Sequence, residues 1–71
     1  MKEHIINING TDYCYKINPV KQTLTIHDPI MAIVNLNAPD DIRIYQHNGD
    51  EGRARRDIQE LMKSIKLVSM Q

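Results

Sequence analysis

The first half of the chain alternates between hydrophobic and polar residues in three short segments, a pattern that predicts half-buried β-strands. The predicted strands are residues 3–8, 12–17 and 22–27. Asn9-Gly10 separates the first two strands and favours a tight hairpin turn, because both residue types tolerate positive φ angles. Proline-containing dipeptides end the second and third strands. These segments therefore predict an antiparallel sheet with short connections.

Two further strands are predicted before residue 47. The run 30–36 is apolar at nearly every position and rich in β-branched residues, which predicts a strand covered on both faces. Residues 37–40 are expected to form a turn, because Asn, Pro and Asp favour turns. In residues 41–46, Ile42 and Ile44 alternate with polar or aromatic side chains, which predicts the fifth strand.

The hydrophobic spacing then changes to three and four residues, which predicts an amphipathic helix over about 51–67. The predicted buried stripe comprises Ala54, Ile58, Leu61, Ile65 and Val68. Asp50 and Glu51 suit the helix N-terminus, where carboxylates meet unpaired backbone amides. The predicted fold class is mainly β: five short antiparallel strands followed by one C-terminal α-helix, in a single domain spanning residues 1–71.

The chain of 71 residues lies near the lower limit for independent folding. Cys14 is the only cysteine, so an intramolecular disulfide is excluded, and the scattered histidines lack the paired spacing of a zinc site. No metal or cofactor is expected. Oligomerisation is then the natural way to bury enough apolar surface, and we expect a homodimer. A single cysteine and an N-terminus without a long apolar stretch favour a cytoplasmic protein with no membrane segment.

The formal net charge is zero, with nine basic and nine acidic residues. This balance argues against sequence-blind binding of nucleic acid, which depends on a positive field. It leaves room for a local basic patch. The densest positive cluster is Arg53, Arg55 and Arg56, and two interpretations are open. The cluster is either a phosphate-binding patch or a solvated helix face, with Arg53 paired to Asp57 and Arg56 to Glu60.

The aromatic and histidine residues also have alternative interpretations. Tyr13, Tyr15 and Tyr45 are candidates to stack on unpaired bases, although tyrosine at the rim of a core is the commoner arrangement. His4, His27 and His47 are expected at the surface. No Ser, Cys or carboxylate lies beside them in a nucleophile motif, and no glycine-rich phosphate loop is present in the sequence. We therefore expect a binding protein rather than an enzyme.

Residues 34–44, Val-Asn-Leu-Asn-Ala-Pro-Asp-Asp-Ile-Arg-Ile, resemble the carbon storage regulator family (CsrA/RsmA), small RNA-binding regulators of translation. The resemblance implies a strand-swapped homodimer with its helices outside the body, and recognition of RNA hairpins. Two positions depart from the family pattern. The first strand has no arginine, and Gln46 occupies a position where the family has one. Because glutamine lacks the charged, planar fork of arginine, an altered RNA-binding surface is implied.

Two functional hypotheses follow. The first is an RNA-binding post-transcriptional regulator of translation that resembles carbon storage regulators. Its candidate RNA-binding residues are Arg43, Tyr45, Gln46, His47, Arg53, Arg55 and Arg56. The alternative is a small protein-binding regulator or inhibitor that acts through a strand edge or the helix face. Zero net charge and the missing arginines favour this second hypothesis.

Overall fold

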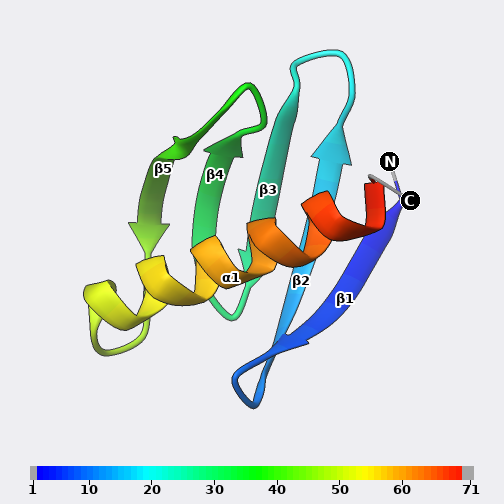
Figure 1. Cartoon of the computed structure of the whole chain (residues 1–71). Coiled ribbons are helices and arrows are strands. Elements are labelled where there is room, and N and C mark those ends of the chain that lie inside the picture. Colours follow the sequence, from blue (N-terminus) through cyan, green and yellow to red (C-terminus); the bar gives the residue numbers. More distant parts are fainter. Residues whose placement is uncertain (1, 70–71) are drawn as a thin grey trace.

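The computed structural model describes the backbone of residues 2–69, and the side chains of these residues except Pro39 and 66–69. Five strands precede one helix (Figure 1), as the sequence predicts. The elements are β1 (Glu3–Ile8), β2 (Thr11–Asn18), β3 (Thr23–Asp28), β4 (Met31–Asn35), β5 (Ala38–Gln46) and α1 (Glu51–Ser69). The predicted fold class, mainly β with five antiparallel strands and a C-terminal helix, is confirmed.

The strands form one sheet in the order β1-β2-β3-β4-β5, and each pairs antiparallel with the next along the chain. β1 and β5 are therefore the two edges. The β1–β2 turn is Asn9-Gly10, with φ angles of 52° and 86°. Both angles lie in the left-handed region that Gly and Asn tolerate best, so the predicted positive-φ turn is confirmed.

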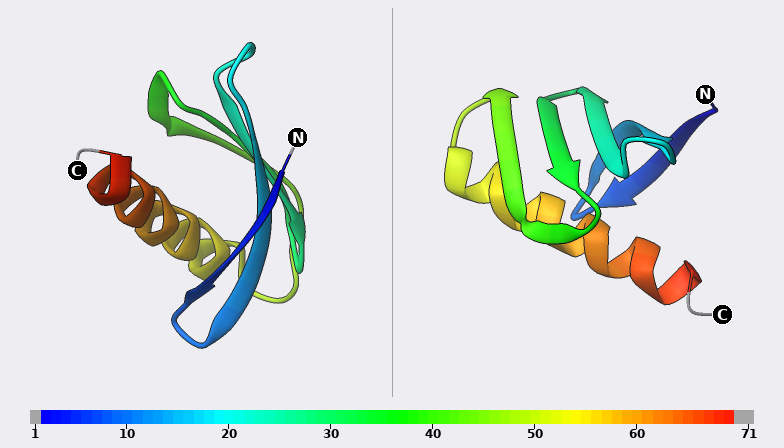
Figure 2. Two further views of the ribbon diagram at one scale, coloured as in Figure 1. Left: turned by 90° about the vertical axis from the view of Figure 1, so that its right-hand side faces the viewer. Right: turned by 90° about the horizontal axis from the view of Figure 1, so that it is seen from above.

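Helix α1 lies across one face of the sheet, from the end of β5 towards β1 (Figures 1 and 2). The cross-strand row Leu24, Val34 and Ile42 points towards it. Ile58 and Leu61 of the helix are fully buried against this face. Burying each such aliphatic side chain contributes roughly 2 kcal/mol. The core is the set Ile8, Tyr13, Leu24, Ile26, Ile30, Ala32, Val34, Ile42, Ala54, Ile58, Leu61 and Met62.

The prediction that residues 30–36 are covered on both faces is wrong. Ala32 and Val34 are buried on the helix side, whereas Met31 is 49% exposed and Ile33 is half-buried on the opposite side. The reason is the single helix, which covers only one face of the sheet (Figure 2). Hereafter the uncovered side is called the open face.

The turn predicted over residues 37–40 is also placed incorrectly. Ala38 already pairs with Asn35, so β5 begins there and the connection is only Leu36-Asn37. The Asn35 side-chain oxygen accepts a hydrogen bond from the Asn37 amide at 2.9 Å, which closes this short turn. Asp40 consequently lies within a strand rather than in a loop.

The helix begins at Glu51, directly after its capping residue. Asp50 Oδ1 accepts a hydrogen bond from the Gly52 amide at 2.8 Å and satisfies one of the unpaired amides of the first turn. Ala54 is buried and Ile65 is half-buried, as the spacing predicts, whereas the predicted burial of Val68 concerns a side chain outside those described. The resemblance implied a helix outside the body, but α1 packs on the sheet and supplies part of the core.

Within residues 2–69, no helix combines the length and the apolar character that crossing a lipid bilayer requires.

Candidate nucleic-acid interface

The open face carries the outward-pointing residues of all five strands. Across its middle, register places Lys16 opposite Thr25, Thr25 opposite Ile33, and Ile33 opposite Arg43. Side chains directly opposite each other in an antiparallel pair share a face and lie about 5 Å apart. Residues that are 27 positions apart in sequence, Lys16 and Arg43, thus belong to one row of the same surface.

Two shallow depressions adjoin each other on the open face, because Thr23 and Ile33 line both. The first has a volume of about 260 Å³ and is lined by Thr23, Ile33, Asn35, Asp41, Arg43 and Tyr45. The second has a volume of about 310 Å³ and is lined by Lys16, Asn18, Lys21, Thr23, Thr25 and Ile33. Together they form a track, hereafter the open-face track, with Tyr45 in one half and both lysines in the other.

Arg43 and Tyr45 are the candidate residues from the sequence that lie in this track. Tyr45 is 63% exposed, unlike Tyr13, which is buried. Arg43 Nε lies 3.8 Å from Asp41 Oδ1, and the two side chains are 71% and 48% exposed. An exposed ion pair at this distance contributes at most about 1 kcal/mol, so the guanidinium is free to exchange Asp41 for another anion.

Gln46 and His47 lie where β5 ends and the chain turns towards α1. Both side chains are exposed. His47 Nδ1 lies 2.9 Å from the Gly49 carbonyl oxygen, an interaction that shapes the connecting loop. The structure does not bring these two residues into either depression of the open-face track.

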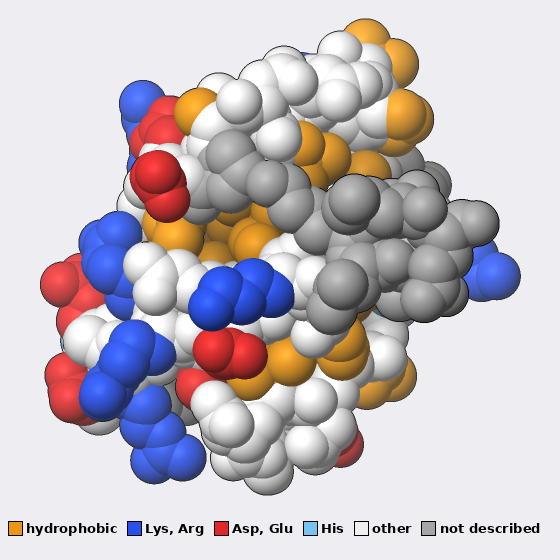
Figure 3. All heavy atoms as spheres, viewed as in Figure 1, with side chains coloured by type: hydrophobic (Ala, Val, Ile, Leu, Met, Phe, Trp, Pro, Cys, Tyr) orange, Lys and Arg blue, Asp and Glu red, His pale blue; other side chains and the backbone are white. Residues whose placement is uncertain are grey.

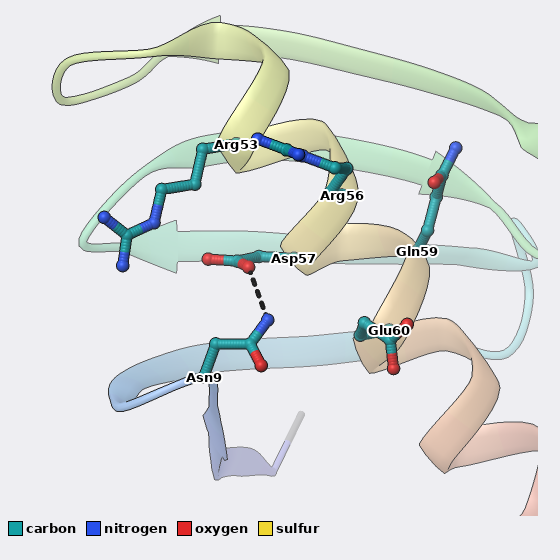
Figure 4. A pocket seen from close by; sticks show the side chains of 6 residues that line it. All are labelled: Asn9, Arg53, Arg56, Asp57, Gln59 and Glu60. Carbon is teal, nitrogen blue, oxygen red and sulfur yellow. Dashed lines mark hydrogen bonds between the residues drawn. The ribbon is translucent and has the colours of Figure 1, made fainter.

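Arg53 and Arg56 belong to α1, on the other side of the sheet. They line a groove of about 590 Å³ with Asn9, Asp57, Gln59 and Glu60 (Figure 4). Basic and acidic side chains are intermingled over the N-terminal half of α1 (Figure 3). The two arginines and the two carboxylates that line this groove cancel in formal charge.

The predicted pairing of Arg53 with Asp57 is wrong. Asp57 is only 4% exposed, and its two oxygens accept hydrogen bonds from Tyr13 Oη at 2.5 Å and Asn9 Nδ2 at 3.0 Å. Desolvation of the phenol, followed by its hydrogen bond to Asp57, raises the pKa of Tyr13 to about 12. Asp57 thus ties the β1–β2 hairpin to the helix.

The predicted pairing of Arg56 with Glu60 is not formed either. Glu60 Oε1 lies 3.9 Å from Lys63 Nζ, three residues further along the helix. Arg55 turns away from the groove and reaches the edge strand, with one guanidinium nitrogen 3.4 Å from the Ile42 carbonyl oxygen. The three arginines therefore do not form a single patch.

The histidines differ in their surroundings. His4 is exposed and stacks on Tyr15, with ring centroids 5.2 Å apart. His27 is half-buried rather than fully at the surface, and its Nε2 lies 3.8 Å from Glu3 Oε1.

The thiol of Cys14 is a weak nucleophile. Its pKa is raised, mainly by burial and next by the negative charge of Glu3. Among the described residues, no cluster of three metal-binding side chains is found.

Several track residues escaped the sequence analysis. Lys16, Lys21, Thr23 and Asn35 were not predicted as binding residues. Strand alternation does place Lys16 and Thr23 opposite the apolar side of their strands. The missing information was the strand order, which brings β2 and β5 onto the same surface through β3 and β4.

Comparisons with protein-family models, with curated proteins and with solved structures find no match for this chain.

Proposed function

We propose that the chain is an RNA-binding post-transcriptional regulator that acts in the cytoplasm as a homodimer and binds unpaired RNA bases on its open face. The observation that carries the proposal is the open-face track, in which exposed Tyr45 and Arg43 share a continuous surface with Lys16 and Lys21. Proteins that bind single-stranded nucleic acid combine aromatic stacking with a positively charged path for the backbone.

Local charge favours the track over the helix groove. Lys16, Lys21 and Arg43 against Asp41 give the track a formal charge of plus two. The groove that contains Arg53 has two arginines against two carboxylates, a sum of zero. Since phosphate contacts provide much of the affinity for nucleic acid, the track is the better site despite the neutral chain.

Each part of the track has a role suited to RNA. Tyr45 stacks on an unpaired base, which is worth about 1–3 kcal/mol per base. Lys16, Lys21 and Arg43 contact phosphates, with Arg43 exchanging its weak bond to Asp41 for a bidentate one. The hydroxyl of Thr23 and the amide of Asn35 lie between them and offer hydrogen bonds to base edges. The choice of RNA, and of hairpin loops in particular, rests on the resemblance of residues 34–44 to carbon storage regulators.

Fluorescence anisotropy with labelled RNA hairpins of randomised loop sequence tests the proposal. We expect saturable binding whose logarithmic salt dependence has a slope of about −2, because three cations each contribute about 0.7. Tyr45→Ala is expected to weaken binding by roughly 5- to 100-fold, and Tyr45→Phe is expected to restore it, because the phenyl ring still stacks. A fully paired RNA duplex should bind much more weakly.

Arg56→Ala is the matched control for Arg43→Ala, since both remove one exposed arginine from opposite sides of the sheet. The proposal requires Arg43→Ala to weaken binding and Arg56→Ala to leave it nearly unchanged. The reverse result would move the site to the helix groove. Absence of saturable binding at physiological salt would refute RNA binding altogether.

A regulator must also act on a message. Once hairpins that bind have been selected, one of them can be placed over the start site of a reporter message in a cell-free translation system. The protein is expected to lower reporter synthesis in proportion to hairpin occupancy, and Tyr45→Ala should relieve the effect.

A further inference from the structure

The two edges of the sheet differ in how far they are protected against pairing with another strand. An exposed strand edge presents unpaired N–H and C=O groups and is a ready template for another chain. On β5, Arg55 reaches the Ile42 carbonyl, the β4–β5 register is broken by two irregularities, and Asp40, Asp41 and Arg43 place charges along the strand. These are the features that discourage pairing at an edge.

Among the described residues, β1 has less of this protection, since Glu3 at its start is its one charged residue. Its six residues pair with β2 in one unbroken register, and the strand contains no proline. Ile5, at its centre, points to the open face and is 69% exposed. An exposed apolar side chain in the middle of a regular edge strand is the arrangement that favours the addition of a further strand.

We propose that the partner at this edge is a second copy of the chain, bound through antiparallel β1–β1 pairing on a two-fold axis at Ile5. The inference refines the homodimer of the proposed function by naming its interface. Pairing of β1 with β5 of another copy would be head-to-tail and prone to open-ended assembly, and the protected β5 edge opposes it. Symmetric β1–β1 pairing closes at two copies.

Symmetry restricts the register. Opposite residues of an antiparallel pair of strands lie on the same face of the sheet. Two β1 strands related by a two-fold axis must therefore place odd-numbered residues opposite odd-numbered ones, and even-numbered residues opposite even-numbered ones. An axis at Ile5 places Ile5 opposite its own copy and Glu3 opposite the partner's Asn7, with no like charges opposed. An axis at Ile6 would instead pair the exposed Ile5 with the partner's Asn7. Burial of apolar surface therefore favours the axis at Ile5.

This register has a consequence for the binding surface. Rotation about an axis normal to the sheet leaves both helices on one side and both open faces on the other. Two five-stranded sheets then become one continuous sheet. The two open-face tracks lie on the same surface, so a single RNA with two unpaired segments is offered both. Linked sites of this kind increase apparent affinity without any new contact.

Ile5→Lys tests the interface, because it places two positive charges directly opposite each other across the axis. Ile5 is exposed within one chain, so the substitution leaves the fold intact. Sedimentation equilibrium of the wild-type chain is expected to give twice the mass of 8.2 kDa. The dimer dissociation constant of Ile5→Lys is expected to rise on the order of tenfold or more, which corresponds to about 1.4 kcal/mol. Val20→Lys, in the exposed turn after β2, is the matched control and should not change it.

A cysteine pair tests the register itself. Ile5→Cys is made together with Cys14→Ser, because Cys14 lies opposite Ile5 within the same chain. A thiol cross-linker that spans about 5 Å, the separation of opposite Cβ atoms, is expected to join two copies through residue 5. Glu3→Cys with Cys14→Ser is the control, since an axis at Ile5 separates the two copies of residue 3 by about 13 Å.

The outcomes are distinct. Dissociation by Ile5→Lys together with cross-linking at residue 5 but not at residue 3 supports the interface. A dimer that is unaffected by Ile5→Lys, or that cross-links equally well at residue 3, overturns the β1–β1 interface and leaves the homodimer standing. A wild-type chain that sediments with the mass of one copy overturns both the β1–β1 interface and the homodimer. The RNA titration needs no dimer and therefore tests the open-face track separately.

Discussion

Tyr13→Phe removes one of the two hydrogen bonds that hold the buried carboxylate of Asp57. The phenyl ring keeps its place in the core, so the change isolates the hydroxyl. Without it, Asp57 Oδ2 loses its donor although the side chain is only 4% exposed, while Asn9 continues to donate to Oδ1. Hydrogen bonds to charged groups are worth about 1.5–3 kcal/mol, and we expect the free energy of unfolding at pH 7 to fall by about 2 kcal/mol.

The same hydroxyl predicts a dependence of stability on pH. Its pKa is raised from 10.0 to about 12 in the folded chain, so above pH 10 the unfolded chain loses this proton first. The stabilisation is complete below pH 10 and is lost as the pH rises to 12, at about 1.4 kcal/mol per pH unit, or about 2–3 kcal/mol in all. Tyr13→Phe lacks this contribution, so its stability should decline less steeply over the same range.

Urea unfolding followed by far-UV circular dichroism measures both effects, at one fixed protein concentration because dimerisation shifts the midpoint. A loss of 2 kcal/mol moves the midpoint by about 1–2 M for a small domain. Tyr15→Phe is the control at pH 7, because none of the described residues forms a hydrogen bond with the Tyr15 hydroxyl. If Tyr13→Phe unfolds within about 0.5 kcal/mol of the wild type and shows the same alkaline slope, Asp57 does not depend on Tyr13 as inferred.

Two further substitutions test how the helix is held. Leu61→Ala is expected to lower the free energy of unfolding by about 2–5 kcal/mol, because Leu61 is fully buried against the sheet. Gln59→Ala, on the exposed side of the helix, is the control and should lower it by less than about 0.5 kcal/mol in the same unfolding assay. Asp50→Ala removes the side chain that caps the Gly52 amide and should lower the free energy of unfolding by about 1 kcal/mol. Asp40→Ala is the control for loss of an exposed carboxylate, and an equal effect of the two substitutions would contradict the capping role.

Strand alternation and helical spacing were sufficient to predict the order of elements, because both depend on residues that are close in sequence. The Asn9-Gly10 turn and the stripe from Ala54 to Leu61 are examples. The wrong predictions concern features that depend on an element distant in sequence. The run 30–36 was predicted to be covered on both faces, since its sequence cannot show that a single helix covers one side of the sheet only.

Contacts between residues distant in sequence also explain why only part of the candidate site was predicted. Helical spacing suggested Arg53 as the partner of Asp57, but Tyr13 lies 44 positions away in sequence and supplies the donor instead. Arg43 and Tyr45 were candidates because they lie in or next to the segment that resembles carbon storage regulators, whereas Lys16 and Lys21 were not. The two lysines lie in the same track as Arg43 and Tyr45 only because of the register of three strand pairs, which no local sequence pattern encodes.

Amide chemical-shift mapping during titration with an RNA hairpin tests the proposed recognition surface most directly, since it locates contacts without any substitution. Binding on the open face predicts saturable shifts centred on Thr23, Ile33, Asn35, Arg43 and Tyr45, with the exposed side of α1 unaffected. Shifts centred on Arg53, Arg56 and Gln59, or a spectrum that RNA leaves unchanged, would contradict it.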